Sequence, residues 1–183
     1  MIPSVEECFG FMEVYGMPPH IRDHSVAVEK IASLLTSALR DAGLDLSLER
    51  VRAAALMHDI AKSICLDSGE DHSAKGREIC LENGLDEIAD IVGDHVRIRN
   101  HRIVGPVSES EIVFYADKRV NHDAVVSLEE RLEYLLERYG RGIERYHQAI
   151  RQNFEVCRLV EAKIFRRIEF GPADVPVLVS TRK

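Results

Sequence analysis

The chain has 183 residues, 45% apolar and 30% charged, which is the balance of one globular domain large enough to bury a core. The formal net charge of −7 argues against nonspecific binding to nucleic acid or anionic membranes, which a basic surface favours. Residues 1–7 lack the basic start of a signal peptide, and no apolar run approaches the roughly 18–20 residues that span a bilayer, so we expect a cytoplasmic protein.

Helical periodicity and capping residues divide the chain into helices. The expected helices span residues 4–15, 20–41, 47–58, 72–82, 86–96, a segment from 108 that includes 117, 127–140 and 143–168. Two of them begin with sequences that fit capping boxes, Ser108 with Glu111 and Ser127 with Glu130. The predicted fold class is all-α.

The helices are expected to form a single domain over residues 18–140. Residues 1–17 would add an N-terminal helix, and residues 141–170 a long C-terminal helix packed on the domain. The apolar stripe of that last helix suits the domain's own core or a second copy of the chain equally well. The tail over 171–183 is expected to be loose or to bind a partner, with a short strand over 175–180.

Ionisable residues recur on the apolar faces of these helices. His58 follows Val51, Ala54 and Ala55 at helical spacing, and Asp59 stands next to it. Three more residues occupy apolar stripes in other segments: His24, His95 and Asp117. Buried groups of this kind are costly unless something compensates them. Because neutral imidazole and carboxylate are good ligands for divalent cations, the convergence of four segments predicts a metal site.

His72 has a weaker pattern, since only Ile79 supports an inward face, but it opens a helix shortly after the His58-Asp59 pair and suits a second metal. Each candidate alone has a structural explanation, as a hydrogen-bonded core histidine or a helix end that reaches water. The remaining histidines at 20, 122 and 147 lack a supporting pattern and are expected at the surface.

The ordered set His24, His58-Asp59 and Asp117 resembles the HD superfamily of metal-dependent phosphohydrolases. Leu56-Met57-His58-Asp59-Ile60-Ala61-Lys62 is similar to the central signature of that superfamily, with Ala61 where glycine is common. Tyr115-Ala116-Asp117-Lys118-Arg119 resembles the segment that carries its last aspartate. The resemblance covers about residues 18–140 and implies a helical fold.

The resemblance implies that His24, His58, Asp59 and Asp117 hold one metal ion. Members with two metals use additional histidines, and His72 and His95 occupy such positions, so that Asp59 would bridge both ions. The arrangement is similar to bacterial HD hydrolases of dinucleoside tetraphosphates, although His72 follows the pair more closely here. No GYP signature is present, which argues against cyclic di-GMP as substrate.

The expected function is hydrolysis of a phosphomonoester or phosphoanhydride in a nucleotide or related metabolite by metal-activated water. Asp59 and Lys62 would act in catalysis, and Lys62, Arg97 and His101 are the candidate phosphate-binding residues. Lys62 has an alternative role as a solvent-exposed lysine that the helix dipole favours at a helix C-terminus. Arg97 and His101 could equally belong to a basic loop that is exposed to solvent. A phosphorylated small molecule is the expected partner, with homo-oligomer formation left open.

The cofactor is expected to be one or two divalent ions per chain, with iron, manganese, cobalt, nickel and zinc all compatible with mixed histidine and carboxylate ligands. Two other functions use the same residues. One is a metal- or nucleotide-binding regulatory module without turnover, and the other is an HD-type di-iron oxygenase.

Overall fold

Side-chain caps begin several of the helices at the residues that the sequence indicates. In the computed structural model, which describes residues 1–66, 68–99 and 105–181, the two expected capping boxes are present, and Ser4 with Glu7 forms a third. Ser47 accepts a hydrogen bond from the backbone N–H of Arg50, and Asp71 accepts from those of Ser73 and Ala74. Each cap satisfies backbone donors that a first helical turn leaves without partners.

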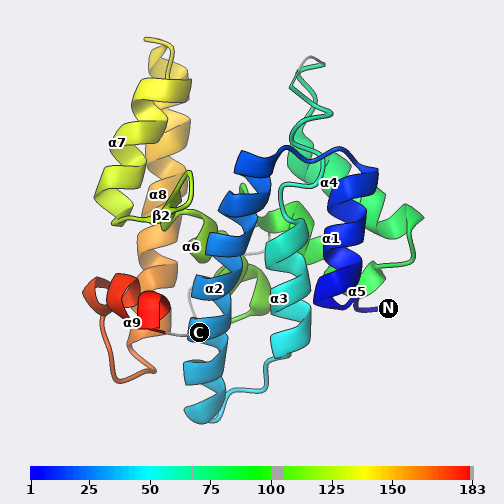
Figure 1. Cartoon of the computed structure of the whole chain (residues 1–183). Helices are drawn as coiled ribbons and strands as arrows, with labels where there is room; N and C mark the ends of the chain where they lie inside the picture. The colour runs from blue at the N-terminus through cyan, green and yellow to red at the C-terminus, as the bar shows by residue number, and fades with distance from the viewer. Residues whose placement is uncertain (67, 100–104, 182–183) are drawn as a thin grey trace.

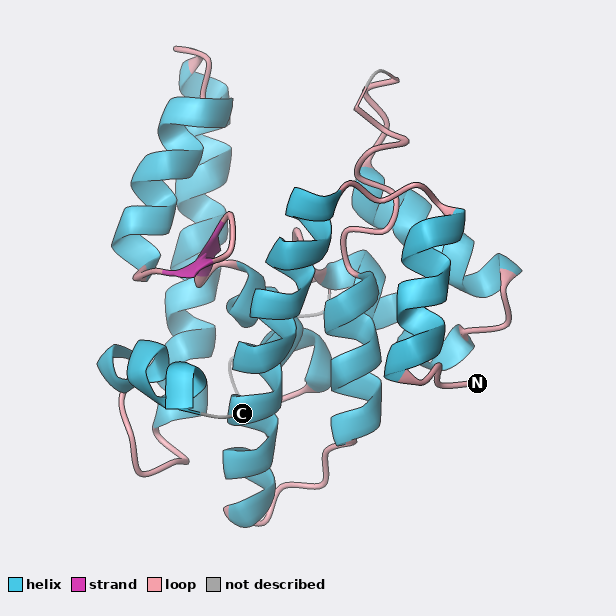
Figure 2. Ribbon diagram, viewed as in Figure 1, coloured by secondary structure: helices cyan, strands magenta, loops and turns pink. Residues whose placement is uncertain are grey.

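The predicted all-α fold is confirmed (Figures 1 and 2). In the described part of the chain the helices are α1 (Val5–Val14), α2 (Pro19–Asp41), α3 (Leu48–Met57), α4 (His72–Glu82), α5 (Asp86–Asp94), α6 (Glu109–Asp117), α7 (Leu128–Tyr139), α8 (Glu144–Phe165) and α9 (Val175–Thr181). The strands β1 (Val120–Asn121) and β2 (Ala124–Val125) form a small antiparallel hairpin.

The long helix α2 lies in the middle of the molecule, packed against α3 and α6 (Figure 1). Helix α3 also packs on α5 and α6, and α4 packs on α5. The alanine run Ala53-Ala54-Ala55 is buried in α3, and such small side chains let neighbouring helices approach closely. One end of each helix from α2 to α6 lies in the same region, and the candidate ligands lie there.

Helices α7 and α8 form a hairpin that stands beside this core (Figure 1). The lower part of α8 packs on α6, and the side chains of Phe154, Cys157, Val160 and Ile164 are buried. The apolar stripe of the long C-terminal helix therefore packs on the chain's own core. None of the helices in the described residues combines the length and the apolar character needed to cross a membrane.

The expected short strand over residues 175–180 is wrong, and residues 172–181 are helical instead of loose, while partner binding by the tail stays a prediction. Residues 172–174 form a 3-10 turn, and α9 follows and packs on α2. Val175 is fully buried, and Leu178 and Val179 pack against the core, whereas Val177 is 64% exposed. The spacing i, i+3, i+4 is that of an amphipathic helix, and it overrides the strand preference of the valines.

Candidate metal centre

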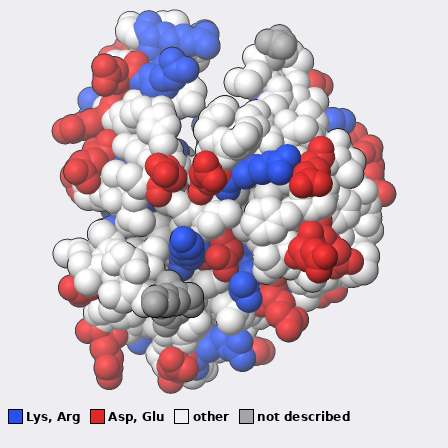
Figure 3. Space-filling view, viewed as in Figure 1, with Lys and Arg blue, Asp and Glu red and all other residues white. Residues whose placement is uncertain are grey.

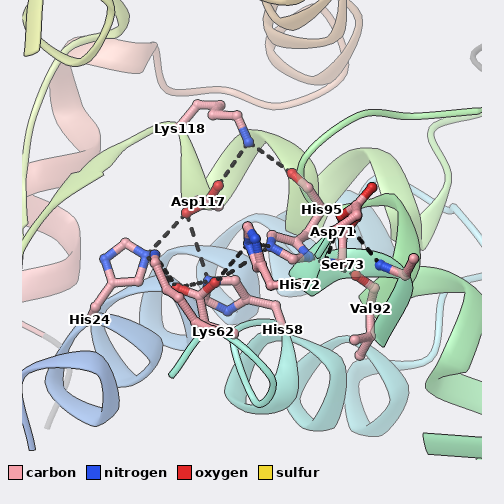
Figure 4. Close-up of polar contacts among 12 residues, drawn as sticks. His24, His58, Lys62, Asp71, His72, Ser73, Val92, His95, Asp117 and Lys118 are labelled. Carbon is pink, nitrogen blue, oxygen red and sulfur yellow. Dashed lines mark hydrogen bonds and ion pairs between the residues drawn. The ribbon is translucent and has the colours of Figure 1, made fainter. Parts of the chain in front are cut away.

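The pair His58-Asp59 ends α3 in the interior. His58 is the C-terminal cap residue of α3, and the side chains of His58 and Asp59 are both essentially inaccessible to water. His24 comes from the first turns of α2, His72 is the first residue of α4, His95 follows α5, and Asp117 is the last residue of α6. Figure 4 labels the four histidines and Asp117 and shows their side chains converging. The structure thus brings together all six predicted metal ligands.

Three of the histidines are oriented by backbone carbonyl groups. The Nδ1 atoms of His24, His58 and His95 lie 2.8, 2.7 and 2.6 Å from the carbonyl oxygens of His122, Ala55 and Val92, respectively. A carbonyl oxygen only accepts hydrogen bonds, so each Nδ1 must carry the proton. In the neutral form, the lone pair of each ring is then on Nε2, which faces the centre, as in protein metal sites.

The carboxylate of Asp59 lies between two groups of nitrogen atoms. Its Oδ2 is 3.4 Å from Nε2 of His58 and 3.9 Å from Nε2 of His24. Its Oδ1 is 3.4 Å from Nε2 of His72 and 3.5 Å from Nε2 of His95. Each oxygen therefore faces a different pair of histidines.

Asp117 completes the first of these groups. Its Oδ1 is 3.0 Å from Nε2 of His24 and 3.7 Å from Nε2 of His58. Its Oδ2 accepts a hydrogen bond from the buried ammonium of Lys118, which also donates to the carbonyl oxygen of His95. We call His24, His58, Asp59 and Asp117 the first donor group, and Asp59, His72 and His95 the second donor group.

The electrostatics of the centre favour a cation. Burial opposes ionisation of Asp59, yet His58 and Lys62 hold its pKa well below the usual range. Burial also opposes a charge on His58, but the carboxylates of Asp59 and Asp117 raise its pKa. Burial lowers the pKa of His95 to about 4 despite the nearby carboxylate of Asp59, so this ring is neutral at pH 7 and available as a ligand.

The residues fit a divalent metal ion. Nε2 of His58 is buried without a hydrogen-bond partner, a costly arrangement that coordination would relieve. Two donors that each lie about 2.0–2.2 Å from one ion are about 3–3.6 Å apart at tetrahedral or octahedral angles. Donor pairs in both groups meet this spacing, including Nε2 of His24 with Oδ1 of Asp117 at 3.0 Å and Nε2 of His72 with Nε2 of His95 at 3.2 Å. His24, His58 and Asp59 of the first group could hold one metal ion, and the three residues of the second group could hold another.

Comparison with known proteins agrees with this geometry. The family model of the HD domain matches residues 21–168, most of the chain. The chain belongs to the HD domain family. Its curated relatives include an uncharacterized protein of Methanocaldococcus jannaschii, 26% identical over 155 residues, which cover 78% of this chain and 90% of the relative. No solved structure matches significantly.

The HD domain match extends beyond residue 140 and includes α7 and α8. These two helices form one wall of a cavity of about 410 Å³ that reaches the donor groups. The opposite wall includes Cys65, Leu66 and Glu70, from the segment between α3 and α4. Figure 3 shows the surface hollowed between the hairpin and this segment.

Of the three predicted phosphate-binding residues, the structure describes Lys62 and Arg97, and both line the cavity. Lys62 lines the cavity, and its ammonium donates to Oδ2 of Asp59 at 2.6 Å. Arg97 is exposed and lies at the cavity lining, while the neighbouring Arg99 pairs with Asp94 at 2.7 Å. His101 lies outside the described residues, so its predicted role stays a prediction.

Two functional features were not predicted from the sequence. Arg131 of α7 lines the cavity with a buried side chain; its Nη1 donates to Oδ1 of Asn121, and its Nε has no hydrogen-bond partner. The sequence does hold a signal for Arg131, because it lies between Leu128 at i−3 and Leu135 at i+4, on an apolar helix face like those that indicate the histidines. The second feature, the His122 carbonyl that orients His24, has no side-chain signal, since the side chain of His122 is exposed.

Proposed function

We propose that this HD domain protein is a metal-dependent phosphohydrolase that cleaves a phosphomonoester or phosphoanhydride bond of a nucleotide or related metabolite. The observation that carries the proposal is the position of Asp59, whose two oxygens face separate histidine pairs. A carboxylate placed in this way suits a centre of two ions, as in many phosphatases.

In this proposal the first donor group holds one divalent ion and the second donor group holds another, with Asp59 shared. When bound, such ions supply a water-derived nucleophile at neutral pH and withdraw charge from phosphoryl oxygens. The protein contributes the orientation of each donor. The carbonyl groups that accept from Nδ1 of His24, His58 and His95 fix the rings before any ion arrives, which lowers the cost of assembling the site.

The positive side chains around the donor groups support a phosphorylated substrate. Lys62, Arg131 and Lys118 line the cavity beside Asp59 and Asp117. Arg131 has donor capacity left over, since its Nε has no partner, and a guanidinium matches the geometry of phosphate oxygens. We assign Lys62 and Arg131 to binding the phosphate group, and Arg97 to contacts at the rim.

The test begins with metal content and phosphate release. Protein purified without chelators would be analysed for bound metals and then screened with manganese, iron, cobalt, nickel or zinc against nucleotides and other phosphate esters. We expect close to two ions per chain in the wild type, and loss of metal and of phosphate release in Asp59→Asn, which keeps the size of the side chain but weakens both donor groups.

Asp90→Asn is the matched control, because Asp90 is an exposed carboxylate outside both donor groups. It should keep the wild-type metal content and activity. Metal binding without phosphate release from any ester would contradict the proposal and favour a regulatory module. Dioxygen consumption by the iron-loaded protein, without phosphate release, would favour an oxygenase.

A further inference from the structure

The cavity has two ends of different chemistry. At the inner end lie the donor groups together with Lys62, Lys118 and Arg131. The outer part is lined by side chains of the α7–α8 hairpin, and most of these are apolar: Leu135, Tyr139, Ala149, Ile150 and Phe154. A ligand that fills the cavity must therefore carry its charge at one end.

The apolar part has a regular origin in the sequence. Leu135 and Tyr139 lie four residues apart on α7, and Ile150 and Phe154 lie four residues apart on α8, so each helix presents two successive turns to the cavity. Phe154 is buried, Leu135 and Ile150 are half-buried, and Tyr139 is 49% exposed. We call the part of the cavity lined by Leu135, Tyr139, Ala149, Ile150 and Phe154 the hairpin slot. Its side chains become more exposed from Phe154 toward Tyr139, which lies at the outer edge.

A hydrogen bond fixes the position of the α7–α8 hairpin relative to the candidate metal centre. The amide of Asn153, which lies between Ile150 and Phe154 on α8, donates to the carbonyl oxygen of Val96 at 2.9 Å. Val96 directly follows His95 of the second donor group. A group bound in the slot is thus placed at a fixed distance from the donor groups.

The charges around the slot restrict what it can hold. Among the lining residues that the structure describes, the positive side chains are Lys62, Lys118 and Arg131 at the inner end and the exposed Arg97. The segment opposite the hairpin adds the carboxylate of Glu70. None of the outer hairpin side chains Leu135, Tyr139, Ala149, Ile150 and Phe154 carries a positive charge, so a second phosphate beside them would have no positive partner there. The hydroxyl groups of a bare sugar would lose water against Leu135 and Ile150.

We infer that the hairpin slot binds an uncharged apolar or aromatic group joined through a short linker to the phosphate of the substrate. This inference rests on the proposed function. It narrows the substrate class to monophosphate esters with one charged end, such as nucleoside 5′-monophosphates or aryl phosphates, and excludes sugar phosphates and molecules with phosphates at both ends. Cavities of this size accept a ligand of that kind.

A matched pair of substrates tests the slot. A nucleoside 5′-monophosphate and ribose 5-phosphate share the same kind of bond and leaving oxygen but differ in the base. For the metal-loaded wild type we expect kcat/KM to be at least about 10-fold higher for the best of the four common nucleoside monophosphates than for ribose 5-phosphate. A ratio near one would overturn the inference.

Variants of α8 locate the effect. Ile150→Ala removes apolar surface from the slot and should lower kcat/KM for the nucleoside monophosphate by about 10-fold, with little change for ribose 5-phosphate. Leu159→Ala is the control, because Leu159 is an exposed leucine of the same helix that does not line the cavity. Equal losses for both substrates in Ile150→Ala would mean that the hairpin acts only through the fold, and would overturn the inference.

A binding measurement separates this inference from the proposed function. Benzylphosphonate and methylphosphonate cannot be hydrolysed as phosphate esters, and they differ by one aromatic ring. Calorimetry on the metal-loaded protein should give tighter binding of benzylphosphonate, and Ile150→Ala should reduce that advantage. If no ester is hydrolysed but the advantage is present, the slot stands and the proposed function fails. If both phosphonates bind equally, the slot fails whatever the activity.

Discussion

The cavity has a floor made where α3, α5 and α6 end and α4 begins, and an outer wall made by the α7–α8 hairpin, and the two differ in burial and polarity. On the floor, His58 is 0% exposed and His95 1%, and both rings are held by backbone carbonyls. On the wall, Tyr139 is 49% exposed and the lining is mostly apolar. The floor is thus organised to hold donor atoms in place, whereas the wall offers a surface.

The difference between floor and wall indicates which substitutions should affect the reaction and which should affect the choice of substrate. A displaced donor on the floor loses a metal ligand, so substitutions there act on the reaction as a whole. A changed side chain on the wall alters which ester fits while the donor groups keep their positions. We therefore expect reactivity to depend on the floor and selectivity to depend on the wall, and the following variants test that division from the largest expected effect to the smallest.

The largest effect is expected from His58→Gln. The substitution removes the buried Nε2 that faces Asp59 and Asp117, so it should abolish metal binding by the first donor group and lower kcat/KM by on the order of 10³-fold or more. Elemental analysis and phosphate-release kinetics would measure both. His122→Ala is the control: it deletes an exposed ring and keeps the carbonyl that accepts from His24, so metal and activity should be unchanged.

Arg131→Ala tests the boundary between floor and wall. Because Arg131 lies outside both donor groups, the variant should keep its metal but lose about 10²-fold in kcat/KM through weaker phosphate binding. Arg131→Lys should recover part of the loss, since it restores the charge without the guanidinium geometry. The exposed Arg138 of the same helix supplies the control Arg138→Ala. Loss of metal in Arg131→Ala would instead mean that the residue positions Asp117, whose Oδ1 lies 3.8 Å from Nη2.

Metal removal should affect the stability of the floor. A chelator should lower the thermal midpoint by about 5–10 °C if the free metal had been near 100 times its dissociation constant, because an ion that binds only the folded state stabilises it by mass action. Scanning calorimetry with and without chelator would measure the shift. Ile150→Ala should show the same shift as the wild type, and a reduced shift there would contradict the separation of the two regions.

The smallest effect concerns the thiols. Burial raises the pKa of Cys8, Cys80 and Cys157 to about 12, so at pH 8 each is almost entirely the unreactive thiol. We expect little alkylation of these three residues by iodoacetamide in the native protein, measured by mass spectrometry of peptides. Cys157 is the informative one, because it lies on α8: its selective alkylation would show that the hairpin separates from the floor.

The donor residues could be predicted from the sequence because ionisable side chains at apolar positions of a helix are exceptional. His24, His95 and Asp117 each break a stripe of aliphatic residues, and the structure brings all three to the His58-Asp59 pair. The first residues of the capped helices could also be predicted from the sequence, because a capping box is a local pattern that does not depend on tertiary contacts.

Other features depend on contacts that the sequence does not display. The hairpin β1–β2 has strands of two residues, too short for alternation, and its turn includes His122 with a positive φ of 54°. Which oxygen of Asp59 faces which histidine pair depends on the packing of four helices. The valines of α9 favour a strand when the sequence is considered alone, although the spacing of Val175, Leu178 and Val179 is helical.

The contact between His24 and Asp117 joins residues 93 positions apart in the chain. During synthesis, the first donor group is incomplete until α6 has left the ribosome, long after α2 and α3 have been made. Metal capture by that group therefore requires that the chain has closed this 93-residue loop. A chain truncated before residue 117 should lack the ion of the first donor group, so occupancy of that group would report that the chain has folded as far as α6.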